Sequence, residues 1–227
     1  MNLIFLIAVA ALAGSVLPAS AATLYSEDFQ SFATGTVNPA DWWSFHGPGS
    51  VTASLTVQSS GIGGSQALEM NVDASGAFGT DWYFYAGVGR SDIVPAGSLA
   101  AFAPGDITLS LDIALFGATV APDLGLFVTQ FSGDKVWETR FNPVLPADGS
   151  FTHLDLNLGQ GTLTGAWVWD PTLAISINSV SFNSTGFPLA AGNRVILDNV
   201  VISVIPEPTA IALLTVAAVF ATRRRSR

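Results

Sequence analysis

The stretch DITLSLDIAL, residues 106–115, alternates apolar and polar side chains from end to end. Its odd-numbered positions, from Ile107 to Leu115, are all Ile or Leu. Its even-numbered positions, from Asp106 to Ala114, are Asp, Thr, Ser or Ala. A period of two is that of a β-strand with one face in a core and the other toward solvent. The stretch therefore predicts a half-buried strand.

The same alternation recurs in VTASLTVQ (51–58), ALEMNVD (67–73) and FTHLDLNL (151–158). Further strands are predicted at 23–32, 81–88, 123–131, 134–141, 173–182 and 194–203. Segments rich in Gly, Ser, Asp and Pro separate them, as turns require. Roughly ten short strands without a persuasive helical period favour an all-β fold, a two-sheet antiparallel β-sandwich of the jelly-roll type.

The N-terminal segment differs from this pattern. Residues 3–17, LIFLIAVAALAGSVL, form an apolar run that is followed by Pro18 and the small residues Ala19-Ser20-Ala21. Such a run before a small-x-small site predicts a secretory signal peptide over residues 1–21, cut after Ala21. The alternative is a buried hydrophobic helix.

The C-terminal segment is also apolar. Residues 209–222 carry no charge, and as a helix they would be about 21 Å long against about 30 Å for the hydrocarbon core of a bilayer. Arginines at 223, 224, 225 and 227 follow; they can snorkel to the membrane surface and keep that flank cytoplasmic. We expect this helix to contact the membrane at least transiently, with the body of the protein outside.

The order Pro206-Glu207-Pro208, apolar helix, then Arg223, Arg224 and Arg225 resembles the PEP-CTERM sorting signal. The resemblance implies an exported bacterial protein that an exosortase-type membrane enzyme processes near the Pro-Glu-Pro. It also implies a final place at the cell surface or in an exopolysaccharide matrix. These residues would then form a sorting signal without a catalytic role. The sorting tail, residues 206–227, would be a segment separate from the body. The alternative is an ordinary C-terminal anchor.

Between the two ends, residues 22–205 are predicted to form one β-sandwich domain, since 184 residues suit a single sandwich of about 200. This body has four basic and 16 acidic residues, a net charge of −12. Such a surface repels phosphate backbones, which excludes nucleic acid as a partner. The chain has no Cys, so disulfides, thiol nucleophiles and cysteine metal sites are excluded as well.

Both ends of the body, YSEDFQSFATG (25–35) and RVILDNVVIS (194–203), are similar to the edges of jelly-roll carbohydrate-binding modules. The resemblance implies a structural calcium ion that joins the ends, with Glu27 or Asp28 and Asp198 as ligands. The modules usually have Phe-Glu where this chain has Phe29-Gln30, a departure at the first strand.

Asp198 also has an independent argument. Strand alternation places it on the face of Ile196, Val200 and Ile202. A carboxylate on an apolar face needs a partner that offsets its desolvation. Calcium or hydrogen-bond donors would both serve.

Aromatic side chains are the main binding candidates, because their flat faces match the C–H faces of sugar rings. Residues Trp42 and Trp43 stand in PADWWSFHG (39–47), which we expect to be a surface loop that also holds His46. The other candidates are Tyr83, Tyr85 and Trp137, with Trp167 and Trp169 as further aromatics. For each tryptophan, packing in the core is the alternative.

The sequence offers few candidates for catalysis. Glu138 shares a predicted strand face with Asp134 and Arg140, and His153 has Asp155 two residues on. Neither a GxSxG elbow nor an HExxH zinc motif accompanies them. We therefore predict a non-catalytic exported protein that binds carbohydrate; the alternatives are a polysaccharide-cleaving sandwich enzyme and a purely structural surface protein.

Overall fold

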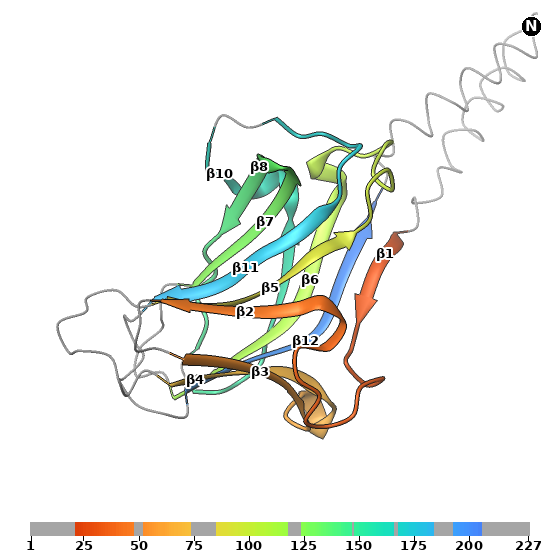
Figure 1. The fold of residues 1–227 in the computed structure, drawn as a ribbon. Helices are drawn as coiled ribbons and strands as arrows, with labels where there is room; N and C mark the ends of the chain where they lie inside the picture. The colour runs from red at the N-terminus through yellow and green to blue at the C-terminus, as the bar shows by residue number, and fades with distance from the viewer. Residues whose placement is uncertain are drawn as a thin grey trace, which may run out of the picture.

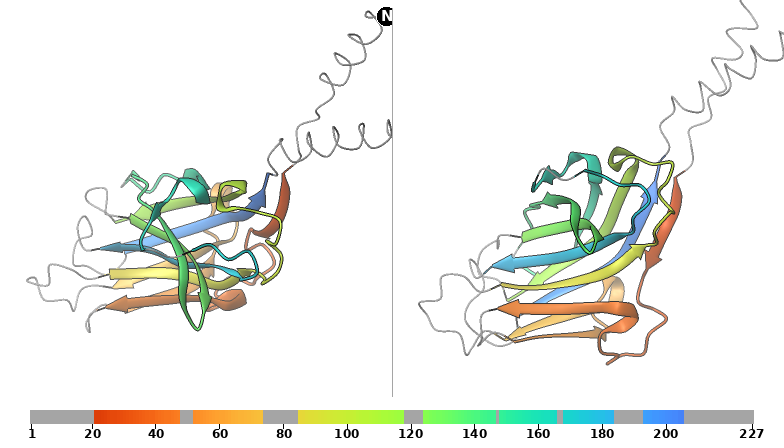
Figure 2. Two further views of the ribbon diagram at one scale, coloured as in Figure 1. Left: turned by 90° about the horizontal axis from the view of Figure 1, so that it is seen from above. Right: turned by 45° about the horizontal axis from the view of Figure 1, so that its top comes forward.

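The computed structural model describes residues 21–47, 52–73, 85–117, 124–146, 148–165, 168–183 and 193–205, without the side chains of residues 85 and 181–183. These residues form an antiparallel β-sandwich of two six-stranded sheets, as predicted (Figure 1). Figure 2 shows the sheets as two stacked layers. The predicted signal peptide, apart from residue 21, and the tail from residue 206 lie outside the described residues.

The first sheet has the strand order β3-β4-β12-β6-β9, and β1 also pairs with β12. Its strands are β1 (Ala22–Glu27), β3 (Thr52–Gln58), β4 (Ala67–Asp73), β6 (Ile107–Phe116), β9 (Thr152–Asn157) and β12 (Asn193–Val204). The N-terminal half of β12 pairs with β4 and its C-terminal half with β1, while β6 runs along its other edge. Strand β12 therefore organises this sheet.

The second sheet has the strand order β10-β8-β7-β11-β5-β2. Its strands are β2 (Trp42–Gly47), β5 (Tyr85–Val94), β7 (Leu124–Ser132), β8 (Asp134–Phe141), β10 (Thr162–Leu163) and β11 (Ile175–Asn183). In the described part of the chain, four short 3₁₀ turns connect strands: η1 (Pro39–Asp41), η2 (Ile62–Gly64), η3 (Pro104–Asp106) and η4 (Leu158–Gln160).

The core lies between the sheets and confirms the predicted alternation. Every odd-numbered apolar side chain of β6, from Ile107 to Leu115, is buried. In β4, Leu68, Met70 and Val72 are buried in the same way. Each large apolar side chain removed from water contributes about 1.5–3 kcal/mol before the entropy cost of ordering the chain. The period-two pattern thus sets which face of each strand points inward.

A β-bulge in β12 corrects one prediction. The register against β6 shifts between Asp198 and Val201, and Asn199 has a left-handed φ of 49°. The extra residue reverses the alternation, so Val200 and Ile202 join the main core while Ile196 belongs to a small separate cluster. The prediction that Asp198 shares a face with Val200 and Ile202 was wrong.

Two other segments differ from expectation. Residues 42–47, predicted to be part of a loop, form β2, an edge strand of the second sheet, so His46 is on a strand. The predicted first strand at 23–32 ends at Glu27, and Phe29 turns the chain with a φ of 60°.

Strands β1 and β12 bring the two ends of the body together, because Ala22 pairs with Val204 (Figure 1). Within the part of the chain that the structure describes, there is no helix with the length and apolar character needed to cross a bilayer.

Candidate functional site

Two aromatic side chains lie side by side on the outer face of the second sheet. Trp43 and Phe45 alternate along β2 with Trp42, which is buried, so their rings point away from the core. Both are half-buried, and their ring centroids are 5.7 Å apart with planes tilted by 47°. The register pairs Trp43 with Gly89 and Phe45 with Gly87 of β5.

The two glycines explain why the rings can lie on the sheet. A Cβ atom at Gly89 would stand 2.5 Å from Cζ2 of Trp43, and one at Gly87 would stand 2.5 Å from Cε1 of Phe45. Both separations are well inside the ordinary contact distance of about 3.5–4.0 Å. Each ring therefore occupies the space that a side chain on β5 would fill. We call Trp43 and Phe45, with Gly87 and Gly89 beneath them, the aromatic platform.

The outer face continues across the sheet to a third ring. Phe127 of β7 is half-buried between the core residues Leu126 and Val128, so it points outward, and the guanidinium of Arg140 lies 5.2 Å from its centroid. Strands β2, β5, β11 and β7 are consecutive neighbours, which puts Phe127 about 14 Å from the platform at about 4.8 Å per strand. On β11, which lies between β5 and β7, Ser179 pairs with Phe127. A small, buried side chain thus stands between the aromatic platform and Phe127.

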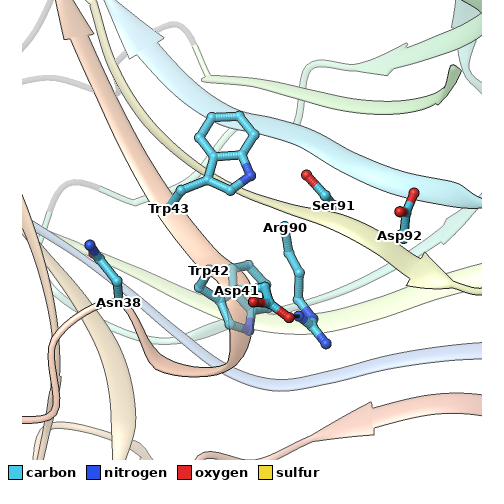
Figure 3. A pocket seen from close by; sticks show the side chains of 7 residues that line it. All are labelled: Asn38, Asp41, Trp42, Trp43, Arg90, Ser91 and Asp92. Carbon is cyan, nitrogen blue, oxygen red and sulfur yellow. Dashed lines mark ion pairs between the residues drawn. The ribbon is translucent and has the colours of Figure 1, made fainter. Parts of the chain in front are cut away.

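A pocket opens at the Trp43 end of the platform (Figure 3). It has a volume of about 630 Å³. Its lining consists of one buried and one half-buried tryptophan, one arginine and four small polar side chains: Asn38, Asp41, Trp42, Trp43, Arg90, Ser91 and Asp92. Mixed aromatic and polar linings of this size are typical of small-ligand sites.

Arg90 connects three parts of the chain at this pocket. Its Nε donates a hydrogen bond of 3.1 Å to Oη of Tyr25 on β1, and its guanidinium lies 5.2 Å from the Tyr25 centroid. Nη1 donates to the carbonyl oxygen of Ala40 in η1 and lies 4.0 Å from Oδ2 of Asp41. Burial raises the pKa of Tyr25 to about 12, against the opposing effect of the Arg90 charge. Arg90 therefore fixes η1 against β5 and β1.

The structure separates the predicted aromatic residues. Trp42 is 1% exposed and packs against Phe29 with centroids 5.8 Å apart, and Trp137 is 3% exposed with its ring edge-on to Trp169 at 5.0 Å. Both rings are buried, so neither Trp42 nor Trp137 has a ring face on which a sugar could stack. Tyr83, Trp167 and the side chain of Tyr85 lie outside the described residues.

Glu138, the best candidate for an acid catalyst, is held in a structural network. It is 3% exposed, its Oε2 lies 2.7 Å from Nζ of Lys135, and its Oε1 accepts a hydrogen bond from the hydroxyl of Thr164. Arg140 stacks on Phe127 instead. The contacts of Glu138 with a cation and a hydroxyl favour a structural ion pair within the sheet.

His153 lies on the outer face of the first sheet between two carboxylates. Its Nδ1 is 2.8 Å from Oδ1 of Asp112 and its Nε2 is 3.4 Å from Oδ1 of Asp155. Oδ2 of Asp112 accepts a further hydrogen bond of 2.8 Å from Nδ2 of Asn199. The hydrogen bond with Asp112 raises the pKa of His153. Asp112 escaped the sequence analysis because only strand pairing brings β6 beside β9.

Asp198 is 1% exposed and accepts three hydrogen bonds. Its Oδ2 accepts from the backbone N–H of Ile62 at 3.2 Å and from Oγ of Ser65 at 3.0 Å, and its Oδ1 accepts from the N–H of Asn199 at 2.8 Å. These donors offset its desolvation. The η2 turn is thereby tied to the bulge of β12.

The other two predicted calcium ligands have local partners. Glu27 accepts from the N–H of Phe29 at 2.9 Å, and Asp28 accepts from the N–H of Gln30 at 3.1 Å. Among the described residues, no group of three or more His, Cys, Asp or Glu side chains is placed to hold a metal ion. The calcium ion predicted at Glu27 or Asp28 and Asp198 stays a prediction.

No model of a known protein family matches the sequence, and a search among curated proteins finds no match. Solved structures do match. The family 11 carbohydrate-binding module of the cellulosomal cellulase Lic26A-Cel5E of Clostridium thermocellum is 16% identical; the match covers 83% of this chain and 96% of that one, with a TM-score of 0.51.

A family 11 module of the same organism in complex with a β-1,3-1,4-mixed-linked tetrasaccharide gives a TM-score of 0.49 at 16% identity, over 81% of this chain and 97% of that one. An exo-β-agarase gives 0.43 at 19% identity, over 83% of this chain and 26% of that one. The structural neighbours are thus carbohydrate-binding modules and parts of enzymes. The first match shows that the body has the sandwich fold of a carbohydrate-binding module.

Proposed function

We propose that the body is a non-catalytic domain that binds polysaccharide on the aromatic platform. The observation that carries this proposal is the placement of Trp43 and Phe45 over Gly87 and Gly89 on the outer face of the sheet. Each of these half-buried rings is held against a glycine of β5 on the outer face instead of packing in the core. A sugar ring can stack there through its apolar C–H face.

The rigidity of the platform favours binding. Both rings belong to one strand and rest against another, so little side-chain entropy remains to be lost when a ligand arrives. The small Ser179 side chain between the platform and Phe127 favours the extension of a chain of sugar rings across the sheet. The sandwich fold shared with the family 11 module supports the same reading by analogy.

We propose further that the protein is exported and sorted to the cell surface or matrix. The support comes from the sequence of residues 1–21 and 206–227, with the Pro-Glu-Pro, apolar and arginine parts in order. An exosortase-type enzyme would be the processing partner. The pairing of Ala22 with Val204 joins both terminal segments to the same end of the body.

Affinity electrophoresis tests the binding function. Every described strand lies within Ala22–Val204, so residues 22–205 contain both sheets and the whole core. This body would be run in native gels containing β-1,3-1,4-mixed-linked glucan, xylan, mannan or agarose, with calcium and with chelator. We expect at least one polymer to retard it, and Trp43→Ala to weaken that retardation at least about tenfold.

Phe116→Ala is the matched control, since Phe116 is a half-buried ring on the other sheet, 4.7 Å from the Arg194 guanidinium. It should leave retardation unchanged. If no polymer retards the protein, or if Trp43→Ala is retarded like the wild type, the platform is not a sugar site and the purely structural role is favoured.

A further inference from the structure

The pocket beside Trp43 has an unusual backbone. Six described non-glycine residues have a positive φ, and three of them line this pocket: Asn38 at 47°, Asp41 at 66° and Asp92 at 47°. A fourth, Ala40 at 46°, precedes Asp41 in η1. Each left-handed residue costs about 1–2 kcal/mol. Such strain persists where the surroundings impose it, and it clusters at ligand sites.

Two hydrogen bonds hold the strained segments in place. The Arg90 guanidinium donates to the carbonyl oxygen of Ala40 and so fixes the η1 turn. On the other wall, the backbone N–H of Asp92 donates a hydrogen bond of 2.9 Å to Oγ of Ser176 on β11. Two separate segments, η1 and the end of β5, therefore present a carboxylate each at one opening.

The lining indicates the chemistry of the ligand. Trp43 contributes an aromatic ring, and Asn38, Asp41, Ser91 and Asp92 are exposed polar side chains that can bind hydroxyl groups. The Arg90 side chain is 16% exposed and is engaged by Tyr25, by the carbonyl oxygen of Ala40 and by the Asp41 carboxylate at 4.0 Å. Two carboxylates at the rim of a body with a net charge of −12 would repel uronate or sulfate groups.

We propose that this pocket is a subsite for one neutral sugar ring of a chain that lies on the aromatic platform. The ring stacks on Trp43, and the carboxylates of Asp41 and Asp92 accept hydrogen bonds from its hydroxyl groups. This inference rests on the proposed polysaccharide-binding function. It adds that the ligand is uncharged and that its recognition extends past the platform to η1.

Asparagine substitutions test the pocket without disturbing the fold. Asp41→Asn and Asp92→Asn keep the side-chain shape, and Asn tolerates a left-handed backbone as Asp does. Replacing a charged acceptor by a neutral one weakens a hydrogen bond by about half, so the double variant should bind the retarding polymer about tenfold more weakly. Asp134→Asn, an exposed acid at the start of β8, is the matched control and should bind like the wild type.

The gels of the glucan, xylan, mannan and agarose panel would be run beside gels of polygalacturonate and alginate. If the Asn double variant binds like the wild type while Trp43→Ala loses retardation, the subsite is refuted and the platform stands. If both bind like the wild type, the proposed function fails as well. Retardation of the wild type by either polyuronate at least as strong as that by the neutral polymers would refute the assignment of an uncharged ligand.

Discussion

Replacing Gly89 by alanine should push Trp43 off the sheet. The new Cβ atom would stand 2.5 Å from Cζ2 and 2.7 Å from Cη2 of Trp43, and 2.7 Å from the carbonyl oxygen of Asn178. Overpacking of this kind costs about 1–3 kcal/mol. Gly89 has no positive φ, so alanine accepts the backbone and gains about 0.4–1 kcal/mol through the unfolded chain. We expect a net loss of about 1–2 kcal/mol in the free energy of unfolding.

A double-mutant cycle isolates the contribution of the ring. In a Trp43→Ala background, two of the three nearest contacts of the new Cβ disappear, while the carbonyl oxygen of Asn178 stays 2.7 Å away. The cost of Gly89→Ala should therefore fall by about 1 kcal/mol or more in that background, which is a measurable coupling between neighbours. Denaturant unfolding of the four proteins gives the four free energies.

Gly105→Ala is the control for the glycine substitution. A Cβ atom at Gly105 meets nothing within 4 Å, and its φ is not in the left-handed region, so its stability should change by less than about 0.5 kcal/mol. An equal cost of Gly89→Ala with and without the Trp43 ring would refute the reasoning, because the ring would not then lie on Gly89. Gly89→Ala should also weaken retardation by the polysaccharide in the same gels.

Four shorter predictions follow from other parts of the fold. Asp198→Ala should lower the free energy of unfolding by about 1–3 kcal/mol, since three donors lose their acceptor; a chelator that lowers the Tm of the wild type would in addition support the predicted calcium ion. For His153, the raised pKa means that its stabilising contact is complete below about pH 6.5 and is lost as pH rises through the folded value; NMR titration should show this pKa falling in Asp112→Asn, and an unchanged value would contradict the hydrogen bond. Tyr25 should ionise near pH 12 by ultraviolet absorbance, so its contribution to stability, present below about pH 10, is lost between pH 10 and 12; ionisation near pH 10 in the folded protein would contradict its burial. Deleting residues 206–227 should leave thermal unfolding cooperative with a Tm within a few degrees of the full chain, because the sheets end before them; a broad, non-cooperative melt would move the domain boundary.

The sequence predicted the strands best where one face is apolar and the other polar. The residues of β6 are the clear case, since each odd-numbered side chain is buried. Strand β2 was missed because Trp42, Trp43 and Phe45 make both of its faces aromatic, which hides the alternation. The bulge at Asn199 was missed because a single inserted residue leaves no compositional signal, yet it changes which face Asp198 shares.

The sequence by itself determined the class of fold, the acidic character of the body and the expectation of export. Alternation, net charge and apolar runs are properties of neighbouring residues, so they can be read without knowing what pairs with what. The tertiary structure alone decided the site. Trp43 meets Gly89, and Asp41 meets Arg90 at the pocket, because antiparallel pairing of β2 with β5 brings together segments more than 40 residues apart. Which aromatic ring is buried and which faces solvent depends on that pairing, and no local pattern encodes it.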